Sequence, residues 1–237
     1  MRVWDINPGY LNRQSLLGEH RELHGIVSIL INNKKGYSHH PETLRWKGFG
    51  WALNQRHKLL AAEMNLRGYQ DRSPVLLKTG KLKWPEVFVD PPAEQFTILA
   101  GKYQNKERGR IPLPGNIQHL WAQHKYSVMA RDVNEYKRIG RWVASRKSGE
   151  GIRDIYLELV RLLRCPPTEG GLRNAVQHMW GYVSSCSLLS GRTLEKMPPR
   201  ELITIIQGLA FQHDVVYLKE STALGELPAW ISTIKNL

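Results

Sequence analysis

The stretch "LLGEHRELHGIVSIL", residues 16–30, predicts the first long helix of the chain. Its apolar residues recur at the spacing of one helical face, which predicts a buried stripe made of Leu16, Leu17, Leu23, Ile26, Val27 and Leu30. Arg21 and Glu22 fall on the other side, between Gly18 and Gly25. Because a glycine inside a helix costs roughly 1 kcal/mol relative to alanine, we expect another segment to approach this face closely. The first residues of the chain are one candidate, and DNA is another.

The rest of the sequence predicts a mainly α fold with two helical domains, residues 1–114 and 115–237. A second helix is expected from about 42 to 67, with Gly68 as its C-terminal stop. The proline-rich stretch 84–115 indicates an irregular linker. In the second half, helical periodicity predicts segments at about 116–129, 132–147, 151–164, 170–189 and 198–212.

The composition favours a polyanionic partner. The chain has 34 Lys and Arg against 21 Asp and Glu, a formal net charge of +13 and a pI near 9.9, values typical of nucleic-acid-binding proteins. A soluble protein kept apart by its own charge is the alternative. No apolar run is long enough to cross a bilayer, and two cysteines make neither a disulfide framework nor a four-cysteine metal cage. We therefore expect a soluble, cytoplasmic protein without a membrane partner.

The α-amino group of Met1 is a candidate nucleophile. Its reference pKa is about 7.7 to 8.0, against about 10.4 for lysine, so a useful fraction is unprotonated near neutral pH. Such an amine can attack the anomeric carbon of a deoxyribose, displace the base and form an imine. A nearby carboxylate, here Glu22, would stabilise the positive charge that builds on the sugar and carry protons. An isolated Arg-Glu pair on a helix is otherwise only a solvated surface pair.

The run "QSLLGEHRELHGI", residues 14–26, resembles the signature helix of the phage pyrimidine-dimer DNA glycosylase family, the endonuclease V type. The similarity continues through "HPETLRWKGFGWALNQRHKLLAAEMNLRGY", residues 40–69. The resemblance implies that the Met1 amine is the nucleophile and that Glu22 serves the sugar chemistry and abasic-site strand cleavage. It implies no cofactor and a double-stranded, damaged DNA substrate. The expected DNA-binding residues are Arg2, Gln14, His20, Arg21 and Lys47.

The chain departs from that family at two places. The family carries a basic residue four positions after its arginine, where this chain has Gly25. The aromatic C-terminal tail of the family has no counterpart here. The lesion is therefore left open, since it could differ from a cyclobutane dimer.

The second half resembles the YbgA-like domain, whose chemistry is unknown. The resemblance rests on "LWAQHKYSVMARD" at 120–132, "YKRIGRWVA" at 136–144 and "PPTEGGLRNAVQHMWGYV" at 166–183. That domain also occurs attached to bacterial desulfidases, which implies a nucleic-acid-binding accessory for RNA as well as DNA. Cations interleaved with Tyr126, Tyr136 and Trp142 suit phosphate contact with base stacking, although a charged surface over buried rings has the same pattern.

A metal site is not expected from the sequence, because no histidine pair shows ligand spacing supported by a nearby carboxylate and a third ligand. We expect a DNA repair glycosylase with abasic-site lyase activity, acting through an imine to the N-terminal amine. The alternative is a non-catalytic nucleic-acid-binding module, for which tRNA is one candidate ligand. The oligomeric state does not follow from the sequence.

Overall fold

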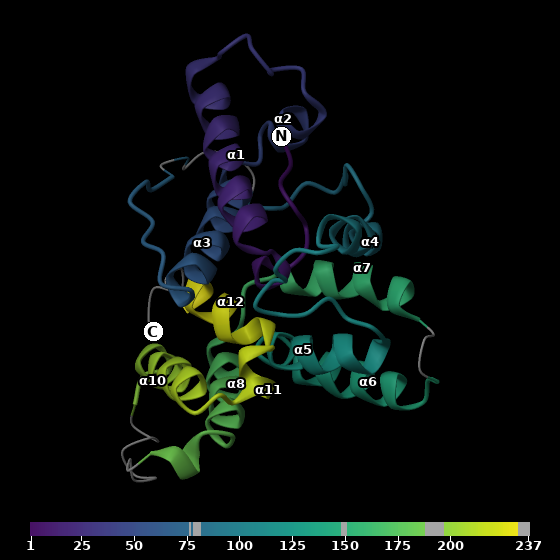
Figure 1. The fold of residues 1–237 in the computed structure, drawn as a ribbon, viewed down its shortest axis with the longest axis vertical. Coiled ribbons are helices and arrows are strands. Elements are labelled where there is room, and N and C mark those ends of the chain that lie inside the picture. The colour runs from purple at the N-terminus through teal and green to yellow at the C-terminus, as the bar shows by residue number, and fades with distance from the viewer. Residues whose placement is uncertain (76, 78–81, 148–150, 188–196, 232–237) are drawn as a thin grey trace. The chain divides into compact units, whose positions relative to one another are not determined.

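The computed structural model describes residues 1–237 except 76, 78–81, 148–150, 188–196 and 232–237 (Figure 1). The described residues form helices and connecting segments without a β-strand, so the predicted mainly α fold is confirmed. The chain divides into two compact units, Met1–Gly109 and Arg110–Leu237. Within the described part of the chain, no helix is both long and apolar enough to span a membrane.

The first unit is built around a pair of long helices. Asn12 caps the first of them by accepting a 2.9 Å hydrogen bond from the backbone N–H of Ser15. This helix packs against the second long helix, and its predicted stripe supplies Leu16, Leu23 and Ile26 to the core with no exposed surface. The elements of this unit are η1 (Pro8–Tyr10), α1 (Arg13–Asn32), α2 (Pro41–Trp46), α3 (Gly50–Leu66) and α4 (Pro92–Lys102).

Two expectations for the first unit were wrong. The single helix expected over 42–67 is divided into α2 and α3, because Gly48 between them has a φ of +84° that a right-handed helix cannot contain. The stretch 84–115, expected to be irregular throughout, contains α4. Pro92 begins this helix, where its missing N–H costs nothing, and Phe96 and Leu99 bury its inner face.

The first twelve residues contain only one helical turn, yet most of them are buried. Their side chains at Val3, Trp4, Ile6 and Tyr10 are at most 4% exposed. Helices satisfy their own backbone groups, whereas an irregular buried segment needs partners from elsewhere. Arg67, at the end of α3, supplies some of them by donating to the carbonyls of residues 8, 9 and 11, the last at 2.7 Å.

The second unit surrounds one central helix. This helix, α5 (Ile117–Met129), packs against α6 (Val133–Ala144), α7 (Ile152–Leu163), α8 (Glu169–Trp180) and α12 (Thr222–Ile231) (Figure 1). The remaining elements are η2 (Ser184–Cys186), α10 (Pro199–Gln212) and α11 (Val216–Lys219). Each predicted helix of the second half corresponds to one of these. The helix expected over 170–189 ends earlier, at Trp180, and is followed by η2, while residues 188 and 189 lie outside the described residues.

Sequence periodicity missed the last helix, α12. Gly225 and Pro228 lie inside it, and both residues favour irregular structure. Nearly all of its residues are buried, so the helix has no polar face and no amphipathic period to detect. Thr222 joins it to α5 by donating a 2.9 Å hydrogen bond to the carbonyl of Gln123.

Candidate active site

The start of the chain lies against Glu22. The backbone N–H of Arg2 donates a short hydrogen bond to Oε2 of Glu22 on α1. Covalent geometry keeps the backbone nitrogens of consecutive residues roughly 3 to 4 Å apart. The α-amino group of Met1 is therefore close to the Glu22 carboxylate, and the side chain of Glu22 is half-buried there.

A second carboxylate of α1, Glu19, fixes the segment that follows. Its Oε1 accepts a 3.1 Å hydrogen bond from the backbone N–H of Trp4. Arg56 of α3 pairs with both oxygens of Glu19, at 2.7 and 2.8 Å, and donates a further 2.8 Å bond to the carbonyl of Ile6. Burial raises the pKa of Glu19 to about 6, while the guanidinium of Arg56 acts in the opposite direction. One buried ion pair thus holds the backbone at two points.

Asp5 is held between α2 and α4. Arg45 of α2 donates to both carboxylate oxygens of Asp5, at 2.7 and 3.1 Å, in the two-pronged geometry typical of arginine. Gln95 of α4 accepts from the backbone N–H of Asp5 at 2.9 Å and donates to its carboxylate at 3.0 Å. Together with the Glu19 and Arg56 contacts, these bonds fix the backbone at Trp4, Asp5 and Ile6, the residues that follow Arg2 and Val3.

A pocket of about 390 Å³ opens beside Glu22. Cationic side chains dominate it: Arg2, Arg21, Lys102 and Lys106 face two carboxylates, and the Glu19 carboxylate is already paired with Arg56. The complete lining is Arg2, Trp4, Asn12, Gln14, Ser15, Gly18, Glu19, Arg21, Glu22, Lys102, Tyr103 and Lys106. The pocket therefore offers one carboxylate among several cations, which suits an anionic ligand.

The pocket brings four of the sequence-predicted site residues together: Arg2, Gln14, Arg21 and Glu22. Gln14 and Arg21 are exposed. Arg2 is less free, because its guanidinium forms a 2.6 Å ion pair with Asp90 and stacks 4.7 Å from the ring centroid of Trp4.

The side chain of Met1 extends to Gly25. Its Sδ lies 4.0 Å from the position that a Cβ of residue 25 would occupy. The start of the chain is thus one segment that approaches the glycine face of α1. At Gly18 no described atom lies within 4 Å of the corresponding position, so this part of the helix is open to the pocket.

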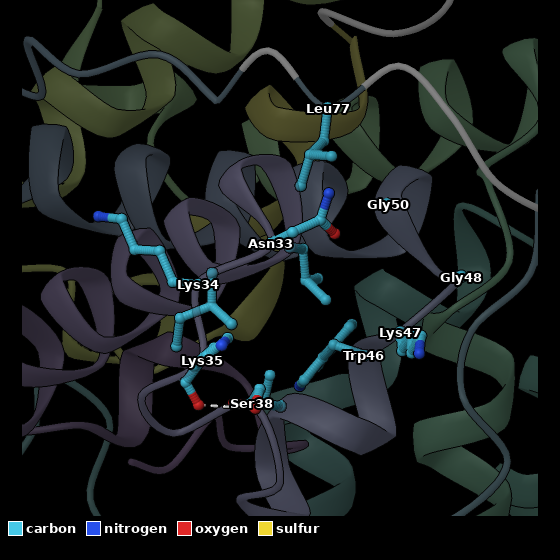
Figure 2. A pocket seen from close by; sticks show the side chains of 12 residues that line it. Asn33, Lys34, Lys35, Ser38, Trp46, Lys47, Gly48, Gly50 and Leu77 are labelled. Carbon is cyan, nitrogen blue, oxygen red and sulfur yellow. Dashed lines mark hydrogen bonds between the residues drawn. The ribbon is translucent and has the colours of Figure 1, made fainter.

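His20 and Lys47 lie elsewhere. His20 belongs to a cluster with His24, and its Nε2 is 3.3 Å from Oδ1 of Asp71. Lys47 lines a different pocket of about 480 Å³, shown in Figure 2, together with Lys34 and Lys35. The described linings of the two pockets share no residue, so Lys47 and Glu22 do not form one site.

Sequence reasoning did not single out Glu19, Lys102 or Lys106. Glu19 lies on the predicted apolar face of α1, three residues after Leu16 and four before Leu23, and a carboxylate in that position could have indicated a buried charge. Its partner could not be read from the pattern, because Arg56 is 37 positions away. Lys102 and Lys106 begin the basic run "KYQNKERGR", residues 102–110, which could have indicated a phosphate-binding edge.

In the second unit, Arg131 is held by other groups of the protein. Arg131 is buried and donates to the carbonyls of Ser127, Leu163 and Cys165 at 2.6 to 2.8 Å. It also forms a 2.7 Å ion pair with Glu226 of α12. This arginine satisfies helix-end carbonyls, and so it does not contribute to a nucleic-acid-binding surface.

Rings and one lysine form a partly exposed cluster in the same unit. Tyr182 and Tyr217 stack with their centroids 4.8 Å apart, and Tyr182 is 42% exposed. The Nζ of Lys125 lies 4.9 Å from the ring centroids of both Tyr126 and Tyr217. This arrangement combines a cation with an accessible aromatic face.

Two protein families match the chain in separate regions. Residues 1–77 match the family described as Pyrimidine dimer DNA glycosylase, and residues 125–228 match the YbgA-like family described as Protein of unknown function (DUF1722). Both resemblances read from the sequence are confirmed. Comparisons with curated proteins and with solved structures gave no match. The first match covers Arg2, Gln14, Arg21 and Glu22.

Proposed function

We propose that this protein is a bifunctional DNA glycosylase and abasic-site lyase that acts on damaged pyrimidines through an imine between the Met1 amine and the deoxyribose. The observation that carries the proposal is the hydrogen bond from the Arg2 backbone N–H to Glu22. It holds the Glu22 carboxylate at the residue that follows Met1, which supports the pairing of an amine with a carboxylate that this chemistry needs. The match of residues 1–77 to the glycosylase family supports the assignment.

The reaction follows from these two groups. The unprotonated amine of Met1 attacks C1′, a C–N bond forms, and the bond from C1′ to the base breaks. The departing base takes a proton, and the amine loses protons as the sugar ring opens to the imine. Glu22 stabilises the cationic sugar and receives or returns these protons. Removal of a C2′ proton from the imine then breaks the C3′–O bond and cuts the strand.

The pocket supplies the contacts that hold DNA during these steps. Arg21, Lys102 and Lys106 are exposed cations on its lining and suit phosphate oxygens. Reaching C1′ inside a duplex requires distortion or extrusion of a nucleotide, which costs a few kcal/mol and least at a damaged base pair. This difference favours damaged over intact DNA.

Borohydride trapping tests the proposal. Protein without a tag ahead of Met1 is incubated with UV-irradiated, abasic-site and undamaged duplexes, and borohydride then reduces any imine to a stable amine. Peptide mapping by mass spectrometry locates the adduct. A matched preparation carries a short peptide ahead of Met1, which moves the amine away from Glu22 and leaves every lysine in place.

We expect an adduct on Met1 with irradiated and abasic DNA, little with undamaged DNA, and none in the extended protein. An adduct on a lysine in both preparations would overturn the role of Met1. Trapping with abasic DNA alone would overturn the glycosylase step and leave a lyase. Absence of any adduct would overturn the enzyme assignment.

A second candidate function is a non-catalytic nucleic-acid-binding module, for which tRNA is one candidate ligand. The cluster of Lys125, Tyr182 and Tyr217 favours it, because bases stack on accessible rings beside a cation. A Tyr182→Ala variant tests it by binding titration with single-stranded RNA and duplex DNA. A several-fold weaker RNA affinity in a protein that traps no DNA would support this function, and unchanged RNA affinity would reject it.

A further inference from the structure

Three histidines and one aspartate form a cluster at α1, next to the helix turn that carries Arg21 and Glu22. His20 and His24 are one turn apart on α1 and so share a face, where His57 of α3 and Asp71 join them. The potential ligand atoms of all four side chains lie within 4.8 Å of one another. These residues are mostly enclosed, with side chains 13%, 5% and 15% exposed at His20, His57 and Asp71.

The chain reverses direction to complete this cluster. Gly68 follows α3 with a φ of +82°, a conformation that glycine adopts without strain. The next residues run back along α3, so Asp71 reaches both neighbouring helices. Its Oδ1 is 3.3 Å from Nε2 of His20, and its Oδ2 is 3.4 Å from Nε2 of His57. The backbone N–H of Ser73 donates a 2.9 Å bond to Oδ1 and orients the carboxylate.

The spacing of these atoms is that of a tetrahedral metal site. With metal–ligand bonds of about 2.0 to 2.1 Å, the ligand atoms of a tetrahedron lie about 3.3 to 3.4 Å apart. The 3.3 Å between Nε2 of His20 and Nε2 of His24 matches this value, as does the 3.3 Å between Nε2 of His20 and Oδ1 of Asp71. His57 lies at a similar distance, 3.4 Å, from the other oxygen of the same carboxylate. Hydrogen bonding alone satisfies the cluster incompletely. Among the described residues, the buried Nε2 of His57 has no partner that meets hydrogen-bond geometry.

We propose that His20, His24, His57 and Asp71 bind one Zn²⁺ ion in a structural site. Three imidazoles and one carboxylate suit zinc, whereas magnesium and calcium require mainly oxygen ligands. Four protein ligands close the tetrahedron and leave no position for a substrate, which is the arrangement of a structural rather than a catalytic zinc. The ion joins α1, α3 and the segment at Asp71 at the turn of α1 that carries Glu22.

The electrostatics of the cluster agree with metal binding. Burial lowers the pKa of His57 to about 4, and burial and the neighbouring His20 lower that of His24. Imidazoles that stay neutral near pH 7 keep a lone pair available for a metal. The expectation from the sequence was that no metal would bind. It rested on spacing with a nearby carboxylate, and Asp71 is 47 positions beyond His24.

The test measures zinc directly on the full-length protein. Protein purified from zinc-supplemented cells is analysed for metal content, stripped with a chelator, and titrated with Zn²⁺ against a competing chelator. His24→Ala and Asp71→Asn remove ligands, and His39→Ala is the matched control because His39 is exposed and outside the cluster. Circular dichroism checks that each variant keeps its helix content. Asp71→Asn changes only one atom and lies outside the helices, so it is the variant least able to unfold the unit.

We expect about one zinc per chain, a higher melting temperature with zinc, and an affinity at least about 100-fold weaker in both ligand variants than in the control. Co²⁺ added to the stripped protein should give the intense visible absorption of a tetrahedral ion, and Asp71→Asn should reduce it. A stripped protein whose melting temperature does not respond to zinc would overturn the proposal. Equal zinc affinity in all three variants would overturn it as well. Neither result depends on the trapping of DNA.

Discussion

The two units use buried charge in different ways. In the first unit, the buried pair of Glu19 on α1 and Arg56 on α3 also binds an irregular segment, through the backbone of Trp4 and Ile6. In the second unit, the buried pair of Arg131 and Glu226 joins helices to one another and to helix-end carbonyls. The comparison shows that charge in the first unit positions the start of the chain, whereas charge in the second stabilises helix packing that apolar contacts already define.

The largest expected effect distinguishes these two roles. Arg56→Met leaves the Glu19 carboxylate buried and unpaired, which should lower the free energy of unfolding by about 3 to 5 kcal/mol. It also removes the donor to the Ile6 carbonyl, so borohydride trapping at Met1 should fall in protein that is still folded. Chemical denaturation and trapping at low temperature measure the two effects.

Arg131→Met is the matched control, since it breaks a buried pair in the second unit. It should cost a similar free energy of unfolding and leave trapping unchanged. If both variants lose trapping in proportion to their lost stability, the contrast between the units is wrong.

The second prediction concerns chemistry without a loss of structure. Glu22→Gln keeps the shape of the side chain and an oxygen for the Arg2 N–H, and removes the charge and the proton acceptor. Strand cleavage should fall by about 100-fold or more, while affinity for damaged duplex changes little. Gel assays of cleavage and binding titrations measure both quantities. Glu94→Gln, an exposed position on α4, should cleave normally, and equal cleavage by both variants would remove Glu22 from the mechanism.

The third prediction concerns the apolar interior of the second unit. Burial, with a smaller contribution from Arg131, lowers the pKa of His124 to about 3 from an ordinary 6.5. Between pH 6.5 and 5 the unfolded chain binds a proton that the folded unit does not. Its free energy of unfolding should therefore fall by about 2 kcal/mol as the pH decreases through this range.

Amide hydrogen exchange in α5 measures this change. His124→Gln should flatten the pH dependence, while His178→Gln, at an exposed position on α8, should keep it. A flat profile in the unaltered protein would show that His124 is protonated in the folded state.

The smallest expected effect sharpens the description of the pocket. Lys106→Ala removes one exposed cation from its lining, so the slope of log affinity against log salt should decrease by about 0.9 if that lysine contacts one phosphate. Lys83→Ala removes an exposed lysine of the same unit that does not line the pocket. Binding titrations of duplex DNA over a range of salt concentrations compare the two, and identical slopes would exclude Lys106 from the DNA contact.

The sequence predicted what depends on local pattern. The apolar stripe of α1 gave the helix and its buried face, and the helix signals of the second half gave most of its elements, because amphipathic periodicity is a local property. It did not predict α12, which is buried on nearly every side. Nor did it predict the Glu19–Arg56 pair or the meeting of Asp71 with His20 and His24, because these partners are distant in sequence and only the tertiary fold brings them together.

The contact between Met1 and Gly25 has a consequence for related chains. The Sδ of Met1 takes up space that a side chain at position 25 would otherwise enter. A chain that loses its first methionine to an aminopeptidase vacates this volume, and a long basic side chain at position 25 can then fill it. In a chain that keeps the methionine, a long side chain at position 25 has to share this volume with the Met1 side chain. We therefore expect the removal of Met1 and the size of the residue at position 25 to covary among related proteins.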